Sequence, residues 1–188
     1  MRRKSFDVLF ETRAGMAYLA QNPTLWRSLF YYVISVGAFV GVCTNIMFAQ
    51  QYITVRIAIL LAILIKCIIG MCIFGFFLHG LIDACGGGSG NVKGLLCILG
   101  FTGLPFLVLT PLSLLAARLG GMGIIVFPVA LFIGCLWSLY LIIRAVEAVY
   151  LIKLKDSCAI VGFGILLWLI MLLLPIYLTI KVILLSIF

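Results

Sequence analysis

Residues 57–82 read IAILLAILIKCIIGMCIFGFFLHGLI, and this stretch decides the class of the protein. Lys66 and His79 carry its basic side chains. A helix needs about 20 consecutive apolar residues to cross the ~30 Å hydrocarbon core of a bilayer, and its backbone polar groups must bond within the segment. The stretch meets the length requirement and therefore predicts a transmembrane α-helix.

Four further stretches of the same kind follow from the sequence, namely residues 29–49, 95–117, 124–152 and 159–187. Of the 188 residues, 66% are hydrophobic and 10% are charged, and the mean hydropathy is +1.38. A soluble domain carries about 25% charged residues, so a water-soluble single domain is excluded. We predict an all-α polytopic membrane protein, a bundle of five transmembrane helices.

The first 27 residues differ from the rest because charged side chains interrupt the apolar ones. They lack the continuous apolar run of a cleaved signal peptide. The pattern predicts an interfacial amphipathic helix, which ends at Asn22-Pro23 because the residue before a proline disfavours the helical conformation. We therefore divide the chain into a cytosolic amphipathic segment, residues 1–27, and a transmembrane domain, residues 28–188.

The distribution of the 13 Lys and Arg residues predicts the orientation. With the N-terminus in the cytosol, the cytosolic side holds eight of them: Arg2, Arg3, Lys4, Arg13, Arg27, Lys93, Lys153 and Lys155. The other side holds three: Arg56, Arg118 and Lys181. Because positive residues favour the cytosolic side, we expect the N-terminus in the cytosol and the C-terminus outside. Membrane lipids account for the basic charge, and we expect no nucleic-acid partner.

Ionisable residues inside spans are costly and often functional. Here they are Lys66, His79 and Asp83 in the second span and Arg144 and Glu147 in the fourth. Their spacing puts His79 with Asp83, and Arg144 with Glu147, on one helix face. Both spans run from outside to inside, which predicts a charge cluster near the inner leaflet. Asp83 could pair with Arg144, or Glu147 with His79 and Lys66, and the cluster is either a structural pair or a polar site for a lipid headgroup, ion or proton.

The third span contains two prolines, Pro105 and Pro111, close to Gly100 and Gly103. These residues predict a kinked or broken helix with freed backbone carbonyls. Transporters use broken helices at binding sites, although a static kink is the commoner outcome.

Two glycine patterns concern packing and turns. Gly37 and Gly41 form a Gly-x-x-x-Gly spacing in the first span, which permits close helix packing within the bundle or between protomers. The glycine-rich residues 86–90 predict a flexible turn between two spans, because they lack the P-loop pattern of a phosphate site.

The sequence offers no set of residues for catalysis or for a cofactor. His79 is the single histidine, and the seven cysteines form no C-x-x-C pair. The G-x-S-x-G and H-E-x-x-H patterns are also missing. We therefore predict no enzyme activity, no cofactor and no metal site.

Three patterns occur in order along the chain: MAYLAQNPTLW at residues 16–26, HGLIDACGGGSG at residues 79–90 and GFTGLPFLVLTP at residues 100–111. Together they resemble the Yip1 domain family of five-span membrane proteins. Eukaryotic members of this family carry a long polar cytosolic region and associate with Rab GTPases. This chain has 27 residues before its first span, so we do not expect Rab-type GTPase binding. The short form resembles a prokaryotic member, which implies the cytoplasmic membrane.

The resemblance and the residues together give two main hypotheses. The first is a non-catalytic membrane scaffold, a membrane-organising or trafficking-type component that acts as a homo-oligomer or with a protein partner in the membrane plane. The alternative is a small transporter or lipid-translocating protein that uses the broken third span and the charge cluster. A membrane-embedded enzyme acting on lipid headgroups comes third.

Overall fold

The computed structural model describes residues 12–47, 50–86, 90–118 and 123–187, and the regular elements in these residues are all helical. Their order is α2 (Thr12–Gln21), α3 (Leu25–Met47), α4 (Ile53–Ala84), α5 (Val92–Leu99), η2 (Gly100–Gly103), α6 (Leu104–Arg118), α7 (Gly123–Tyr150) and α8 (Leu154–Ile187). The element η2 is a short 3₁₀-helix. The predicted all-α class is confirmed.

Five segments are long and apolar enough to cross a membrane, as predicted, and they lie in α3, α4, the combined α5–η2–α6 segment, α7 and α8. Each begins before its predicted stretch because the helix continues through the polar residues that flank the apolar run. The longest of the first four spans, α4, has 32 residues, about 48 Å at 1.5 Å per residue. It exceeds the ~30 Å hydrocarbon core, so it must tilt or protrude into the headgroup layer.

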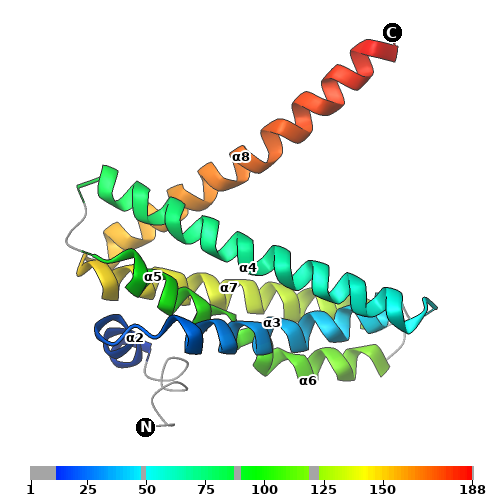
Figure 1. The fold of residues 1–188 in the computed structure, drawn as a ribbon, viewed down its shortest axis with the longest axis horizontal. Helices are drawn as coiled ribbons and strands as arrows, with labels where there is room; N and C mark the ends of the chain where they lie inside the picture. Colours follow the sequence, from blue (N-terminus) through cyan, green and yellow to red (C-terminus); the bar gives the residue numbers. More distant parts are fainter. Residues whose placement is uncertain (1–11, 48–49, 87–89, 119–122, 188) are drawn as a thin grey trace.

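The third span is the centre of the bundle. In its apolar window 61% of the residues are buried, against 0% in the window of the second span. Helix α3 packs along α6 and η2, α7 packs on α6 and α5, and α4 packs on α5. Figure 1 shows α3, α6 and α7 side by side, with α8 diverging from α4 toward the C-terminus.

Two hydrophobic clusters form the interior, and α5 and α7 contribute to both. The first joins α2, α5, η2, α6 and α7 through Met16, Leu19, Cys97, Ile98, Phe101, Leu104, Leu141 and Ala145. The second joins α4, α5, α7 and α8 through Leu78, Ile82, Leu95, Leu99, Val146, Tyr150 and Val161. The short helix α5 therefore links the two halves of the core.

The break in the third span lies where α3 comes closest. A Cβ at Gly100 would stand 2.8 Å from the carbonyl oxygen of Ser28, and a Cβ at Gly103 would stand 3.1 Å from the Tyr32 ring. All four residues of η2 are buried. The lack of side chains at these glycines lets the backbone of η2 pack against α3, and a short 3₁₀-helix here interrupts the α-helix of the third span.

The prolines of the third span flank the break rather than cause it directly. Pro105 is the second residue of α6, within the first turn, where backbone N–H groups have no partner inside the helix. Pro111 lies in the interior of α6 and is exposed, and the helix continues through it.

The N-terminal helix α2 ends directly before Asn22-Pro23, as predicted. Its apolar side chains Met16 and Leu19 are 0% and 3% exposed in the first cluster, so this face of the helix meets the other helices. Helix α2 packs against α5 and α7, and the Thr24 backbone N–H donates to Cys97 Sγ at 3.3 Å. The described part of the N-terminal segment thus belongs to the bundle.

The Gly-x-x-x-Gly pair of the first span makes looser contacts than the glycines of the break. A Cβ at Gly37 would meet the Leu64 side chain of α4 at an ordinary 3.6 Å, and no described atom lies within 4 Å of a Cβ at Gly41. The close backbone approach of α3 is therefore to η2.

The contact between η2 and α3 can be tested by replacing Gly100. We expect Gly100→Ala to lower the free energy of unfolding by about 1–3 kcal/mol, because the added methyl overpacks the contact with the Ser28 backbone. The control is Gly70→Ala in α4, where no described atom lies within 4 Å of the new methyl. SDS titration measures the stability of both variants. Equal free energies of unfolding for Gly100→Ala and Gly70→Ala would contradict the account.

Candidate intramembrane polar site

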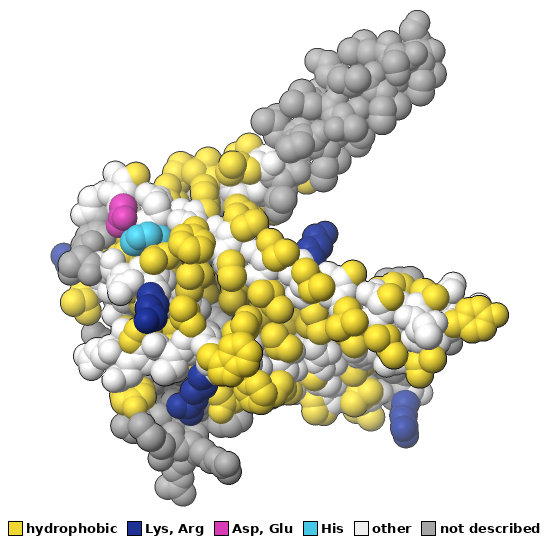
Figure 2. Space-filling model, in the orientation of Figure 1, with side chains coloured by type: hydrophobic (Ala, Val, Ile, Leu, Met, Phe, Trp, Pro, Cys, Tyr) yellow, Lys and Arg dark blue, Asp and Glu magenta, His cyan; other side chains and the backbone are white. Residues whose placement is uncertain are grey.

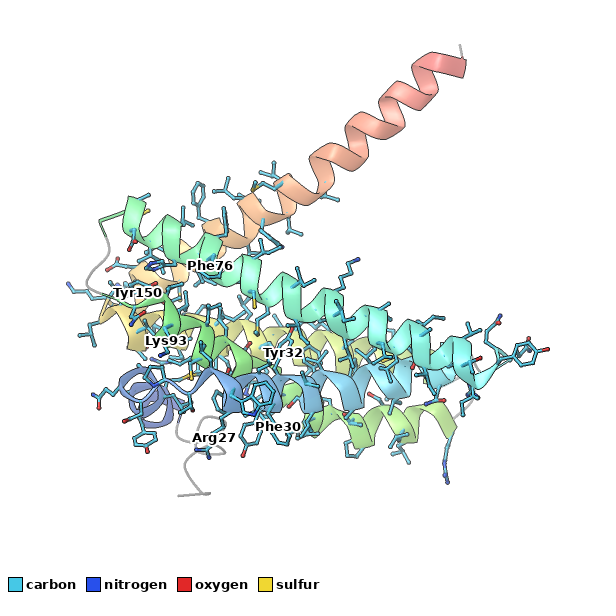
Figure 3. The ribbon with its side chains drawn as sticks, viewed as in Figure 1. Arg27, Phe30, Tyr32, Phe76, Lys93 and Tyr150 are labelled. Carbon is cyan, nitrogen blue, oxygen red and sulfur yellow. The ribbon has the colours of Figure 1, made fainter. Side chains whose placement is uncertain are left out.

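The C-terminal parts of α4 and α7 meet through His79 and Tyr150. Figure 3 labels Tyr150 at the end of α7. Nδ1 of His79 and the Tyr150 hydroxyl form a hydrogen bond. On the other side of the imidazole, Nε2 lies 3.4 Å from Oδ2 of Asp83, one turn further along α4. Tyr150 is buried and the Asp83 side chain is 55% exposed. The group of Tyr150, His79 and Asp83 therefore runs from the buried interior at Tyr150 to the surface at Asp83. Figure 2 shows an acidic and a histidine side chain together on the surface.

The turn that precedes α5 positions Tyr150. The Tyr150 ring fills the space that a Cβ at Gly90 would need, and the next residue, Asn91, caps α5 by accepting the Lys93 backbone N–H at 2.8 Å. Gly86 has φ +73°, a left-handed conformation that favours glycine. Both described ends of the predicted glycine-rich turn thus require glycine for geometric reasons, while residues 87–89 lie outside the described part.

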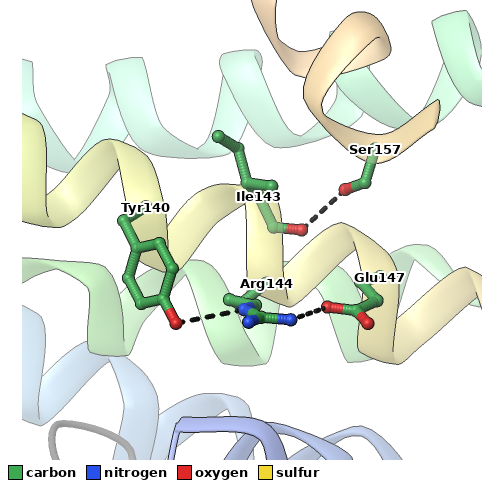
Figure 4. A network of polar contacts seen from close by, with 5 residues as sticks. All are labelled: Tyr140, Ile143, Arg144, Glu147 and Ser157. Atoms are coloured by element: carbon green, nitrogen blue, oxygen red, sulfur yellow. Dashed lines mark hydrogen bonds and ion pairs between the residues drawn. The ribbon is translucent and has the colours of Figure 1, made fainter. Parts of the chain in front are cut away.

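A second polar group lies within α7 (Figure 4). The Arg144 guanidinium donates from Nη1 to Oε2 of Glu147 at 2.6 Å and from Nε to the Tyr140 hydroxyl at 3.1 Å. It also lies over the Tyr140 ring, 5.4 Å from the centroid. The side chains of Arg144 and Glu147 are 22% and 17% exposed. A short, mostly buried, charge-assisted hydrogen bond of this kind holds both charges in one orientation.

Close to this group, the start of α8 is tied to α7. The Ser157 hydroxyl donates to the Ile143 carbonyl oxygen at 2.6 Å (Figure 4). Ser157 is fully buried, and this hydrogen bond satisfies it. The bond fixes where α8 leaves the end of α7.

Four of the five predicted residues form two groups rather than one cluster, and Lys66 belongs to neither. Sequence reasoning expected pairs between the second and fourth spans, whereas each ion pair in the described residues joins neighbours on one helix. The link between α4 and α7 is the His79–Tyr150 hydrogen bond. Tyr150 and Tyr140 were missed as partners, although Tyr140 lies four residues before Arg144, a spacing that places both on one face.

The two groups also lie at different depths. His79 meets the last residue of α7, so Arg144 lies six residues, about 9 Å, deeper along the helix axis. The sequence predicted similar depths for all four residues. The register of α4 against α7, which the hydrogen bond fixes, accounts for the offset.

Lys66 lies apart from both groups, on the exposed face of α4. It has no hydrogen bond or ion pair with any described residue. On translocon insertion scales an ionised lysine at the middle of a span costs about 2.5–3.5 kcal/mol. The structure gives this charge no partner within the described chain.

Three backbone carbonyl oxygens near the break in the third span accept hydrogen bonds from side-chain hydroxyl groups. The Thr102 hydroxyl donates to the Leu99 carbonyl oxygen at 2.7 Å, and the Ser138 hydroxyl of α7 donates to the Thr102 carbonyl oxygen at 2.8 Å. Ser28 donates to the Leu96 carbonyl oxygen at 3.5 Å. The sequence did not predict the roles of Ser28 and Ser138, because the residues around a serine in a span do not indicate which carbonyl oxygen its hydroxyl will bond. In the described residues, no three His, Cys, Asp or Glu side chains are placed to hold a metal ion.

The His79–Tyr150 bond predicts a coupling between two helices. Tyr150→Phe and His79→Gln should each lower the free energy of unfolding, and a double-mutant cycle should give a coupling of about 0.5–1.5 kcal/mol. The control is Tyr52→Phe, since Tyr52 is 83% exposed between α3 and α4. Additive effects of the two substitutions in detergent unfolding would show that the bond contributes nothing.

The comparisons with known proteins agree with this architecture. The model of the Yip1 domain family matches residues 6–178. No curated protein and no solved structure matches the chain. Five apolar spans and a family match over nearly the whole length make this a multi-pass integral membrane protein that belongs to the Yip1 domain family.

Proposed function

We propose that this protein is a non-catalytic membrane scaffold, a membrane-organising or trafficking-type component. The observation that carries the proposal is that four of the five candidate residues, His79, Asp83, Arg144 and Glu147, are engaged by side chains of α4 and α7. Arg144 bonds Glu147 and Tyr140, and His79 bonds Tyr150 and lies beside Asp83. Charges held in this way stabilise an arrangement of helices.

The broken third span supports the same proposal. A break that binds a solute must present its free carbonyls to a cavity. In η2 all four residues are buried, and the Ser138 hydroxyl donates a hydrogen bond to the Thr102 carbonyl oxygen. The alternative, a transporter or lipid translocator that uses Pro105, Pro111 and the polar residues, requires this packed segment to open.

A scaffold of this kind acts through its membrane-facing surface. Large apolar side chains are exposed along α4, α7 and α8, among them Leu61, Ile65, Ile69, Phe132, Leu136 and Leu166. Such side chains suit lipid acyl chains and the helices of a homo-oligomer or of another membrane protein. The proposed partners therefore lie in the membrane plane, and neither a Rab-type GTPase nor a nucleic acid is part of the proposal.

The proposal places the N-terminus in the cytosol of a prokaryotic cell and the C-terminus outside, on the distribution of basic residues. In that orientation Lys153 faces the cytosol and Gln51 the outside. A membrane-impermeant maleimide applied to intact cells should label Gln51→Cys and spare Lys153→Cys in a background without other cysteines.

Reconstituted vesicles separate the scaffold from the translocator. In vesicles of phosphatidylethanolamine and phosphatidylglycerol, we expect both the wild type and Glu147→Gln to leave transbilayer movement of a fluorescent phosphatidylglycerol at the rate of protein-free vesicles. Glu147→Gln should still lower the free energy of unfolding by about 1–3 kcal/mol, because it leaves Arg144 mostly buried without its carboxylate.

The matched control for this experiment is Asp156→Asn. It removes an exposed carboxylate in the first turn of α8, so its effect on stability should be smaller. Lipid movement that the wild type catalyses, and that Glu147→Gln abolishes while remaining folded, would replace the scaffold with the translocator.

A further inference from the structure

Lys66 lies near the middle of an apolar face of α4. Its neighbours on this face are large and exposed: Leu61, Ile65, Ile69 and Ile73 are each 50–57% exposed. Figure 2 shows basic side chains standing out from an apolar surface of the molecule. We call the surface formed by Leu61, Ile65, Lys66, Ile69 and Ile73 the Lys66 face.

The position of Lys66 along α4 puts its ammonium group out of reach of the headgroups. Arg56, near the start of α4, donates to Oδ1 of Asn45 at 3.0 Å and marks one end of the α3–α4 pair. Lys66 lies ten residues further, about 15 Å along the axis, and an extended lysine side chain reaches about 6 Å. Snorkelling alone therefore leaves the charge within the hydrocarbon core.

No described carboxylate of this chain lies at that depth. Asp83 is 17 residues away on the same helix, about 25 Å along the axis, and lies beside His79. Glu147 is bonded to Arg144, and Asp156 lies in the first turn of α8, beyond the end of α7.

A second copy of the chain offers no carboxylate at this depth within the described residues. Two copies inserted in the same orientation are related by an axis along the membrane normal, so each residue meets its partner at equal depth. Lys66 would then face the middle of the second copy, where the described residues hold no Asp or Glu. The partner must be a different membrane protein.

We propose that the Lys66 face binds a transmembrane helix of another protein that carries an Asp or Glu near the middle of the bilayer. The pairing removes an isolated charge from the hydrocarbon core for both partners, and the flanking isoleucines supply a packing surface. This inference rests on the proposed scaffold function and gives the scaffold a partner of defined chemistry.

The test uses the full-length protein in lipid vesicles and a synthetic leucine–alanine transmembrane peptide with one central Glu. Fluorescence energy transfer between labelled protein and peptide measures association. We expect Lys66→Leu to weaken binding of the Glu peptide about tenfold and Lys66→Arg to keep it. Lys155→Leu, which removes an exposed lysine at the start of α8, should leave it unchanged, and a peptide with central Leu should bind the wild type about as weakly as the Glu peptide binds Lys66→Leu.

Two results would overturn the proposal. One is equal binding of the Glu and Leu peptides, or equal binding by the wild type and Lys66→Leu. The other is self-association that Lys66→Leu abolishes, seen by single-molecule photobleaching in the same vesicles, which would make a second copy the occupant. Neither result depends on lipid movement, so failure of this proposal is distinguishable from failure of the scaffold function.

Discussion

A helix that breaks inside a bilayer exposes backbone polar groups that lipid does not satisfy. In this protein the break is η2, and the rest of the bundle is arranged around it. The backbone of helix α3 packs against η2 at Gly100, which has no side chain to keep it away. Helix α7 supplies the Ser138 hydroxyl, which donates to the Thr102 carbonyl oxygen. The third span is consequently the most buried of the five, while the second span faces outward.

The same requirement governs the charges. Lipid provides neither counter-ions nor water, so each ionised group in a span must find a partner in the protein, reach the headgroups or remain costly. Arg144 and Glu147 satisfy one another within one turn of α7, and Tyr140 completes the guanidinium contacts. His79 and Tyr150 join α4 to α7 at one end of the bundle. Lys66, which has no such neighbour among the described residues, lies on the exposed face of α4, where we propose that a helix of another membrane protein binds.

The membrane explains which features were predictable from the sequence. Spans are visible because a helix must be apolar for about 20 residues, and the break in the third span is visible because glycine and proline cluster there. The end of α2 at Asn22-Pro23 follows from the conformational restriction before proline. These features depend on local chemistry, which one sequence contains in full.

Features that depend on register between helices were not predictable. The burial of Met16 and Leu19 was missed because an apolar helix face looks the same whether it meets lipid or protein. His79 and Tyr150 are 71 positions apart in the sequence, and their pairing depends on how α4 and α7 align. Which end of the third span breaks against α3 likewise depends on Ser28, a residue that no motif connects with Gly100.

Amide hydrogen exchange in lipid nanodiscs tests the central claim, that the broken third span is closed inside the bundle. The account predicts that the amides of Gly100–Gly103 exchange as slowly as those of the middle of α7, because η2 is buried between α3 and α7. Exchange at η2 as fast as in the connection between α3 and α4 would show that water reaches the break, and would contradict the closed bundle on which the scaffold function rests.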